Sequence, residues 1–446
     1  MKKILSATLA LSMLLSLCGC SGDTNSTTSD QEVIYEEIRV EDENSSSSST
    51  NSVVSSEETN SNEQSSVVDT SSETKPTVTE EKIVIDYNKT VEIDICDDVI
   101  RGYLDASTPR QQYEFLSQYD TMKLDYQVLP VRWKPDGSVK YTLHLSEKQD
   151  FSNAEIVTIT GTYDGDELVG GQVAVTCVPG KTYYWKVYGA SKESPRGGGK
   201  IKIVNQPVRW IEIDGVPNVR DMGGWTTESG KTIKYGKIYR GSRFDDITDK
   251  GIATLKKLGI KTDIDIRSTA SWDSHGPGEN TGLDYYFINT GASYDAIFRG
   301  DGTPSEEVRA NYPQIFAMLA DESYYPIYLH CNFGNDRTGT IAYIMNGLLG
   351  VNYEDLTRDY EITSYAFTHD RRWRGNGYGG TFGPNDLIQN NISNSEVDGR
   401  WGVLNKTFME SKYCTDGKLS TAIEAFLLDA GVQQKHIDAY KKIMLG

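Results

Sequence analysis

The sequence predicts two folded parts of different class: a β-sandwich, followed by an α/β domain whose central sheet is flanked by helices. Between about residues 125 and 205, short apolar runs of strand type are separated by turn residues. From about residue 209 onward, strand-like runs alternate with stretches of helical apolar spacing. Residues 21–82 contain almost no large apolar side chains, so this segment cannot build a hydrophobic core.

The stretch from Pro326 to Thr340 is the most informative part of the α/β domain. A short apolar run leads into a polar, glycine-containing loop, and a helix follows. At such a helix start, backbone N–H groups and the helix dipole favour an anion. The loop contains Cys331, whose pKa should be lowered there so that it is a nucleophilic thiolate. Six residues later, Arg337 offers a planar fork for two phosphate oxygens, so the stretch predicts a phosphate site with its own nucleophile.

Three motifs in order along the chain resemble one family. Residues 330–339 read His-Cys-Asn-Phe-Gly-Asn-Asp-Arg-Thr-Gly, which resembles the signature loop of the bacterial tyrosine-phosphatase-like enzymes, a group of cysteine-dependent phosphatases. Residues 218–224, Asn-Val-Arg-Asp-Met-Gly-Gly, are similar to the Asn-Phe-Arg-Asp-Leu-Gly-Gly element of that family. Residues 265–267, Asp-Ile-Arg, resemble its Asp-Leu-Arg element. The resemblance covers about residues 209–446 and implies a cysteine-phosphatase-like sheet.

The residue types of the loop predict the reaction. Cys331 should attack phosphorus and form a cysteinyl-phosphate intermediate, while Arg337 meets the charge that develops on the equatorial oxygens. The resemblance makes Asp336 the leading general acid for the leaving oxygen, with Asp265 as the alternative. Thr338 is expected to donate a hydrogen bond to the sulfur.

Further residues are predicted to contact the phosphate through backbone N–H groups or side chains: Asn332, Phe333, Gly334, Asn335, Thr338 and Gly339. Asp265 and Arg267 end a strand, and strand ends line the ligand crevice of an open α/β sheet, so we expect both to border the site. The alternative is an internal salt bridge between them. For Arg220 and Asp221 we favour a structural role as ion partners. No metal or other cofactor is expected, because the chemistry needs none and no clustered His/Cys pattern occurs.

Three functions fit this site. The first is a protein-tyrosine phosphatase, because Asn335 stands where the resembled family often has lysine, which removes one positive charge from the site. The second is a phosphoinositide or inositol phosphate phosphatase. The third is a catalytically inert surface module that only binds phosphoryl groups.

The N-terminus predicts export and a lipid anchor. Two lysines precede an apolar stretch that is too short to span a membrane, as in an export signal. The end of this stretch resembles a bacterial lipobox, with Leu17 three residues before Cys20 and Gly19 directly before it. Residues 1–20 are therefore expected to be a signal segment, and Cys20 to carry the lipid at the extracytoplasmic face of the cell membrane.

Residues 21–82 predict a disordered acidic tether rich in serine and threonine. They hold 15 acidic and three basic residues, a net charge of −12 out of −19 for the whole chain. About 60 such residues span roughly 40–45 Å as a random coil and more when their charges repel. Because the acidity lies mostly in this segment and no basic patch accompanies it, we expect no nucleic-acid partner.

Two domains are expected after the tether, at residues 83–206 and 207–446. In the first, the spacing of the strands around Trp133, Tyr141 and Trp185 resembles a fibronectin type III-like β-sandwich. The glycine-rich run Ser194 to Gly199 is expected to be a loop. The remaining expected elements are helices at 108–119, 249–258, 306–319, 353–366, 419–428 and 433–444, a strand at 284–289 and a basic, aromatic insert at 369–383 that either closes over the site or is a surface loop.

Four cysteines follow the lipobox pair, which is few for a disulfide-rich exported domain. Cys96 and Cys177 are the one pair considered for a bridge in the first domain. Outside the cell, the nucleophilic thiol of Cys331 is expected to be open to oxidation.

Overall fold

A computed structural model of the chain describes most of the residues after the predicted tether. The described residues are 83–96, 98–106, 111, 115, 128–172, 177–267, 281–290, 293–294, 296–363 and 400–446. The predicted signal segment, tether and insert at 369–383 lie outside these residues, as does nearly all of the predicted helix at 108–119. Within the described part of the chain, no helix combines the length and apolar character that crossing a bilayer would require.

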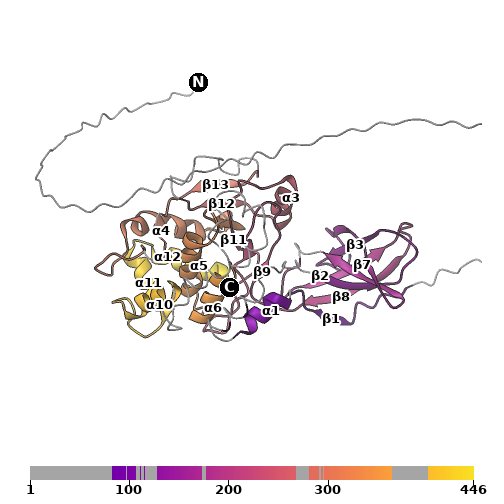
Figure 1. Ribbon diagram of the computed structural model, residues 1–446, viewed down its shortest axis with the longest axis horizontal. Helices are drawn as coiled ribbons and strands as arrows, with labels where there is room; N and C mark the ends of the chain where they lie inside the picture. The colour runs from indigo at the N-terminus through magenta and orange to yellow at the C-terminus, as the bar shows by residue number, and fades with distance from the viewer. Residues whose placement is uncertain are drawn as a thin grey trace, which may run out of the picture. The chain divides into compact units, whose positions relative to one another are not determined.

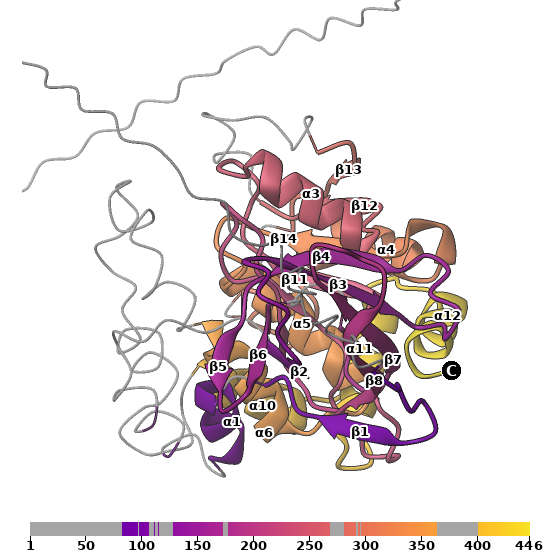
Figure 2. The ribbon, with the colours of Figure 1, turned by 90° about the vertical axis from the view of Figure 1, so that its right-hand side faces the viewer.

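The first part consists of two β-sheets (Figure 1). Five strands form one sheet in the order β1-β8-β7-β3-β4. Three strands form the other sheet in the order β2-β6-β5, and Figure 2 shows these three strands side by side. The bounds are β1 Thr90–Ile93, β2 Val128–Trp133, β3 Tyr141–Ser146, β4 Glu155–Ile159, β5 Thr162–Asp164, β6 Glu167–Gln172, β7 Thr182–Tyr188 and β8 Pro195–Ile203. Buried residues of both sheets, among them Trp133, Leu143 and Val187, share one hydrophobic core.

Strand β8 corrects one expectation. Its glycine-rich start, predicted as a loop, pairs antiparallel with β7, with Gly199 opposite Trp185. A side chain at Gly197 would place its Cβ 2.8 Å from the carbonyl oxygen of Arg132 and 2.9 Å from Cβ of Trp133. Glycine is therefore required there because β2 passes close to β8, a reason that a local turn pattern does not reveal.

The second part is built on a six-stranded sheet in the order β13-β12-β14-β11-β10-β9. The bounds are β9 Arg209–Trp210, β10 Arg220–Asp221, β11 Ile238–Gly241, β12 Thr262–Asp265, β13 Asp284–Phe287 and β14 Ile327–His330. Strands β11, β14, β12 and β13 are parallel, whereas β10 runs antiparallel to both β9 and β11. The strand predicted at 284–289 is confirmed and is two residues shorter.

Central strand β14 is buried on both faces, which is the pattern of a sheet covered by helices on two sides. Ile327 and Leu329 belong to the large core cluster that includes residues of the C-terminal helices. Tyr328, pointing to the other face, packs in a second cluster with Leu255 of helix α3. The predicted α/β architecture of this part is thereby confirmed.

The helices around this sheet agree closely with the prediction. The bounds are α3 Asp249–Leu258, α4 Glu306–Leu319, α5 Asp336–Leu348, α6 Tyr353–Glu361, α10 Arg400–Glu410, α11 Leu419–Asp429 and α12 Gln434–Leu445, with a short 3₁₀ turn η2 at Glu322–Tyr324. Helix α5 packs against α6 and α11 and is buried along nearly its whole length. The helix expected to reach residue 366 ends at Glu361, and residues 364–366 lie outside the described part of the chain.

One helix joins the two parts of the chain in an unexpected way. Helix α1 (Asp98–Asp105) follows strand β1, yet Ile100 and Tyr103 belong to the core cluster of the second part. The Tyr103 hydroxyl donates to the carbonyl of Arg358 at 2.8 Å, and the Arg358 guanidinium donates to the carbonyl of Ala106 at 2.8 Å. The core of the α/β part therefore includes two residues of helix α1, although β2 to β8 of the first part follow this helix in the sequence.

All four described cysteines are free thiols, so the possible Cys96–Cys177 bridge is not formed. Cys177 is buried in the core of the β-sheets, whereas Cys96 packs at the edge of the core of the α/β part. The two cysteines thus belong to different cores.

Candidate active site

The predicted nucleophile lies between the central strand and a buried helix. Strand β14 ends at His330 and helix α5 begins at Asp336. We call residues 331–337 the cysteine loop. Because β14 lies between β11 and β12, the loop stands at the carboxyl end of the central parallel strands. Cys331 is buried, with 3% of its surface exposed.

Three consecutive carbonyls of the loop accept hydrogen bonds from the segment 240–243 and from Asn218. The bonds run from Arg243 N to Asn332 O (3.2 Å), from Asn218 Nδ2 and Ser242 Oγ to Phe333 O (2.8 and 3.1 Å), and from Arg240 Nη2 to Gly334 O (2.8 Å). In a trans peptide the carbonyl and the next N–H point in opposite directions. The N–H groups of the loop are therefore directed away from this segment, as donors for an anion.

Gly334 is required by the path of the loop. Its φ of +67° lies in the left-handed region, which side chains disfavour. A Cβ at this position would also lie 2.3 Å from the carbonyl oxygen of Gly241. Glycine is thus needed at this turn for two reasons: the backbone conformation and the close approach of Gly241.

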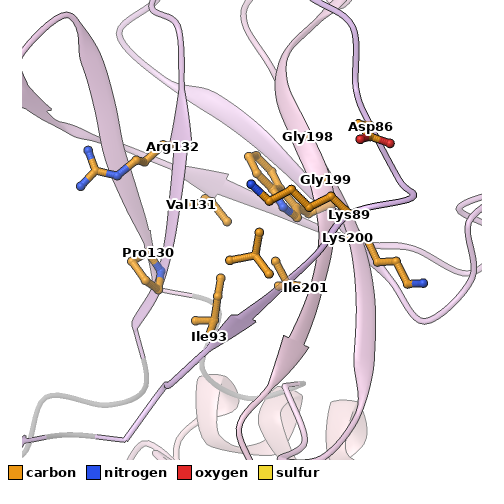
Figure 3. Close-up of a pocket in the computed structure, with 12 residues that line it drawn as sticks. Asp86, Lys89, Ile93, Pro130, Val131, Arg132, Gly198, Gly199, Lys200 and Ile201 are labelled. Carbon is orange, nitrogen blue, oxygen red and sulfur yellow. The ribbon is translucent and has the colours of Figure 1, made fainter.

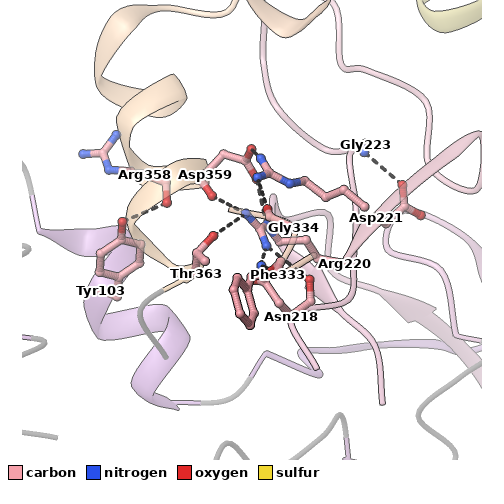
Figure 4. Close-up of polar contacts among 11 residues, drawn as sticks. Tyr103, Asn218, Arg220, Asp221, Gly223, Phe333, Gly334, Arg358, Asp359 and Thr363 are labelled. Atoms are coloured by element: carbon pink, nitrogen blue, oxygen red, sulfur yellow. Dashed lines mark hydrogen bonds and ion pairs between the residues drawn. The ribbon is translucent and has the colours of Figure 1, made fainter. Parts of the chain in front are cut away.

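Behind the loop, Asp359 of helix α6 binds two arginines at once (Figure 4). Its Oδ1 accepts from Arg220 Nε at 3.0 Å, and its Oδ2 accepts from Arg240 Nη1 at 2.6 Å. Arg220 also donates to Thr363 Oγ1 at 3.1 Å and to Asn218 Oδ1 at 2.6 Å. This network fixes Asn218 and Arg240, which hold two of the loop carbonyls. It also confirms the structural role expected for Arg220.

The charges of this network are unequal. Burial and then the nearby charge of Arg240 lower the pKa of Arg220 to about 10, and Asp359 offsets this only in part. Burial alone would raise the pKa of Asp359, but the charges of the two arginines and their hydrogen bonds outweigh it and lower that pKa. Two guanidinium groups thus share one carboxylate, and the excess positive charge beneath the loop favours an anion in it.

The thiol of Cys331 is shifted toward its ionised form. Burial alone would raise its pKa, but the positive charge of Arg337 and the adjacent Thr338 outweigh burial and lower the pKa. Asp336 acts in the opposite direction, as a nearby negative charge. The balance supports a nucleophilic thiolate, as the sequence predicted.

His330 supports the loop from the side of the sheet. Its Nε2 lies 3.1 Å from Asp263 Oδ1, and its Nδ1 is 2.9 Å from the carbonyl oxygen of Cys331. Burial would lower the pKa of His330, but Asp263, Asp265 and these hydrogen bonds raise it to about 9. A protonated ring donates from both nitrogens, so His330 orders the loop through hydrogen bonds.

Asp265 and Arg267 form an internal ion pair, the alternative weighed from the sequence. Arg267 Nη2 lies 2.7 Å from Asp265 Oδ2 and its Nη1 lies 3.3 Å from Asp245 Oδ1. The Tyr285 hydroxyl donates to Asp265 Oδ2 at 2.9 Å. Burial would raise the pKa of Asp265, but His330 and Arg267 outweigh it and lower the pKa. A carboxylate held ionised and engaged in this way is a poor proton donor, which favours Asp336 as the acid.

The other predicted residues come together in the loop and the first turn of α5. Arg337 is half-exposed and makes no ion pair or hydrogen bond with the described part of the chain. Asp336 is half-exposed beside it in the first helical turn. The remaining members lie in the same seven-residue stretch or directly after it: Asn332, Phe333, Gly334, Asn335, Thr338 and Gly339. The Gly339 N–H donates to the Asn335 carbonyl at 2.6 Å and closes the first turn.

Sequence reasoning missed several residues that shape the loop. Arg240 lies in β11 and Ser242 directly follows that strand, and no motif in the sequence singles out either residue. Asp359 lies on helix α6 and Thr363 lies two residues after its end, 139 and 143 positions from their partner Arg220. Their role depends on being buried next to Arg220, and a single sequence does not show which residues are buried together.

No group of three or more histidine, cysteine, aspartate or glutamate residues within the described ranges is arranged to hold a metal ion. The predicted insert at 369–383, with its arginines, is outside those ranges. The cysteine loop and the first turn of α5 bring together a thiol, a guanidinium group, a carboxylate and backbone N–H groups.

Comparison with known proteins agrees with this reading of the site. Residues 211–446 match the model of a family described as the tyrosine phosphatase family. The triple specificity protein phosphatase PtpB of Mycobacterium tuberculosis is 22% identical over 289 residues, 53% of this chain and 99% of that protein. A protein of Cupriavidus necator whose name places it among the tyrosine-protein phosphatases is 24% identical over 175 residues. The match covers 34% of this chain and 61% of that protein.

Two further similar proteins match a smaller part of this chain. A tyrosine-protein phosphatase of Nostoc commune is 25% identical over 134 residues, 27% of this chain and 45% of that protein. Among solved structures, the core catalytic domain of the PP-IP phosphatase SIW14 from S. cerevisiae, in complex with citrate, is 17% identical with a TM-score of 0.21. It covers 29% of this chain and 74% of that one.

Proposed function

Because this chain belongs to the tyrosine phosphatase family, residues 211–446 form a cysteine-dependent phosphatase domain, and we propose that the protein hydrolyses phosphotyrosine in proteins. The observation that carries this proposal is the combination of a Cys331 thiol of lowered pKa with the nearby Arg337, whose side chain makes no ion pair or hydrogen bond with the described part of the chain. A phosphate monoester fits both groups, because its oxygens can accept hydrogen bonds from Arg337 and its phosphorus can be attacked by Cys331.

The reaction follows from the residues of the loop. The thiolate of Cys331 attacks phosphorus, the bond from phosphorus to the substrate oxygen breaks, and Asp336 donates its proton to that oxygen. Asp336 then accepts a proton from water, which attacks the cysteinyl phosphate and releases inorganic phosphate and the thiolate. Arg337 and the loop N–H groups bind the equatorial oxygens, where charge develops in each transition state.

The choice of substrate rests on the charge near the site. Asn335 contributes no charge, and its side chain is buried, with 3% exposed. Among the described residues of the loop, Arg337 is therefore the one cation that faces the phosphate. A single phosphate on a tyrosyl ring suits such a site better than a polyphosphorylated inositol ring, which needs more cations. An inositol phosphate or phosphoinositide substrate is the second candidate, and the broad specificity in the name of the mycobacterial relative motivates testing it.

A substrate panel tests this choice. Residues 83–446 would be assayed with a phosphotyrosine peptide, a phosphoserine peptide and a short-chain phosphatidylinositol phosphate, without added metal. We expect kcat/KM for the phosphotyrosine peptide to exceed the other two by about tenfold or more, since the deep loop and single cation favour an aryl monoester. A preference for the lipid would mean that the missing charge at Asn335 does not set specificity.

We propose that Cys20 is lipidated and anchors the protein at the extracytoplasmic face of the cell membrane, with residues 21–82 as an acidic tether. The support is the small residue Gly19 before Cys20 and Leu17 three residues before it. A pair of acyl chains would give the stable attachment that one chain does not. Cys20→Ala should abolish metabolic labelling with fatty acid and membrane association, whereas Cys18→Ala should preserve both. Labelling that survives Cys20→Ala would rule out this cysteine.

We further propose that the first part is a fibronectin type III-like β-sandwich. Its support is the pairing of a five-stranded with a three-stranded sheet around one core. An experimental structure of the intact protein would test the strand order, and a different order would reject the likeness.

A further inference from the structure

Asn335 lies in the cysteine loop directly before helix α5, and it is buried, with 3% of its surface exposed. The Gly339 N–H donates to its carbonyl at 2.6 Å, which fixes its backbone. Its side-chain Nδ2 donates to Oδ1 of the neighbouring Asp336 at 3.4 Å. The carboxamide of Asn335 therefore contacts the side chain that supplies the proton in the proposed reaction.

The other end of this carboxamide lacks a partner. Among the described residues, no group donates a hydrogen bond to Oδ1 of Asn335, although this atom is buried. The side chain also makes no hydrogen bond to the backbone at the start of α5. Buried polar atoms are nearly always paired, so an unpaired acceptor next to a reacting carboxyl group indicates a role in that group's chemistry.

A carboxamide can contact a carboxyl group in either protonation state. Its NH₂ end donates to an ionised carboxylate, and its oxygen accepts from a protonated carboxyl group. Because the two ends have nearly the same shape, half a turn of the amide brings Oδ1 of Asn335 to the place of Nδ2, next to Asp336. The unpaired oxygen is thus the acceptor that a protonated Asp336 can use.

Asp336 changes its protonation state twice in each cycle of the proposed reaction. It carries a proton when the leaving oxygen departs and is ionised when water attacks the cysteinyl phosphate. A charged neighbour would favour one of these states. An ammonium group, as in the lysine that the resembled family often has at position 335, favours the ionised form, and a second carboxylate favours the protonated form. The neutral carboxamide of Asn335 favours neither form by charge.

We propose that Asn335 is a positioning residue for Asp336, whose carboxyl group it holds in both protonation states by turning its carboxamide between two orientations. Asn335 thereby sets the pH range in which Asp336 carries the proton for the leaving group. This role rests on the proposed phosphatase reaction and assigns a function to the asparagine that distinguishes this loop.

The pH dependence of kcat/KM separates this role from a structural one. The full chain would be assayed with phenyl phosphate, whose leaving group needs a proton, and the alkaline limb of the profile reports the ionisation of the acid. Asn335→Asp, nearly equal in size, places a second carboxylate beside Asp336 and should move this limb to higher pH by about one unit or more. Asn335→Lys should move it to lower pH by about the same amount.

The leaving group provides a second measurement. Asn335→Leu keeps the size of the side chain but cannot bond to Asp336 in either state, so kcat/KM for phenyl phosphate should fall about fivefold or more. The leaving group of p-nitrophenyl phosphate departs without a proton, so its kcat/KM should change less than about twofold. In the Asp336→Asn background, Asn335→Leu should have no further effect on phenyl phosphate, because the two side chains act as a pair.

Two control variants separate the effects of net charge and of the loop. Lys200→Gln changes the net charge by the same amount as Asn335→Asp, but Lys200 lies on β8 of the first part (Figure 3), with its Nζ 5.8 Å from the centre of the Tyr184 ring. Its alkaline limb should stay within about 0.2 pH unit of the wild type. Asn332→Leu changes another asparagine of the loop and should affect both aryl phosphates equally.

An alkaline limb that does not move in Asn335→Asp would overturn the role of Asn335, as would equal losses on the two aryl phosphates in Asn335→Leu. An equal shift in Lys200→Gln and Asn335→Asp would overturn it by assigning the effect to net charge. If Asn335→Lys does not fold, Asn335→Asp is sufficient, because it keeps the size of the side chain. Failure of the phosphatase reaction gives a different result, namely hydrolysis of phenyl phosphate that persists in Cys331→Ser.

Discussion

The Cys331→Ser protein is expected to hydrolyse an aryl phosphate roughly 10⁴-fold or more slowly than the wild type, at equal protein concentration and without metal. The lowered pKa of Cys331 depends on Arg337 and Thr338, and these groups cannot ionise a serine hydroxyl, whose pKa is far higher. Without the thiolate no cysteinyl phosphate forms, although the loop can still bind phosphate. Release of the aryl alcohol, followed by absorbance, measures the change.

A matched control separates the nucleophile from thiols in general. Cys414 is also a free cysteine and lies outside the loop, so Cys414→Ser should retain full activity. Binding of a phosphotyrosine peptide to Cys331→Ser should remain within about tenfold of the wild type. If the wild type itself binds the peptide and shows no turnover over hours, the chain is an inert phosphoryl-binding module. Wild-type rates in Cys331→Ser would reject the mechanism.

The Asp359→Asn protein should lose about 3–5 kcal/mol of the free energy of unfolding, measured by urea denaturation. The substitution keeps the size of the side chain but removes the one carboxylate that the buried Arg220 and Arg240 share. Because two guanidinium groups then remain buried without a counter-charge, the penalty should greatly exceed that of an exposed ion pair. Activity should also fall at temperatures where the variant is still folded, since Arg240 holds the carbonyl of Gly334 in the loop.

Asp355→Asn is the control on the same helix. Asp355 pairs with Arg358 at 2.6 Å, and both side chains are partly exposed, at 19% and 16%. Its loss should change the free energy of unfolding by about 1 kcal/mol or less. Equal losses in the two variants would show that the buried arginines do not depend on Asp359. If Asp359→Asn does not fold, Asp359→Glu, which restores the charge, should recover part of the stability.

The elements that the sequence predicted well are those with local signals. Helix α3 begins after Thr248, whose side chain accepts from the N–H of Gly251, and ends at Gly259 in a left-handed conformation. Both caps and the apolar spacing between them lie within a dozen residues, so a single sequence suffices. The same holds for the cysteine loop, where the strand, the nucleophile, the arginine and the helix start follow one another.

What the sequence did not reveal depends on contacts between distant residues. Whether Arg267 contacts a substrate or Asp265 is decided by Asp245 and Tyr285, which come from other elements. Asp359 meets its partner Arg240 across 119 positions. The glycines of β8 have an ordinary turn composition, and only the approach of β2 and Trp185 explains why they stand in a strand. In each case the deciding neighbour is supplied by the tertiary fold.

Helix α1 affects how this protein can be divided experimentally. The family match starts at residue 211, but Tyr103 is fully buried in the core of the matched region and donates to the carbonyl of Arg358, the residue next to Asp359. A gene fragment that begins at residue 207 would lack Ile100 and Tyr103 and would leave an apolar recess in their place. This recess lies at helix α6, whose Asp359 binds Arg220 and Arg240. The smallest unit suitable for crystallisation or for fusion to another protein therefore starts before residue 98.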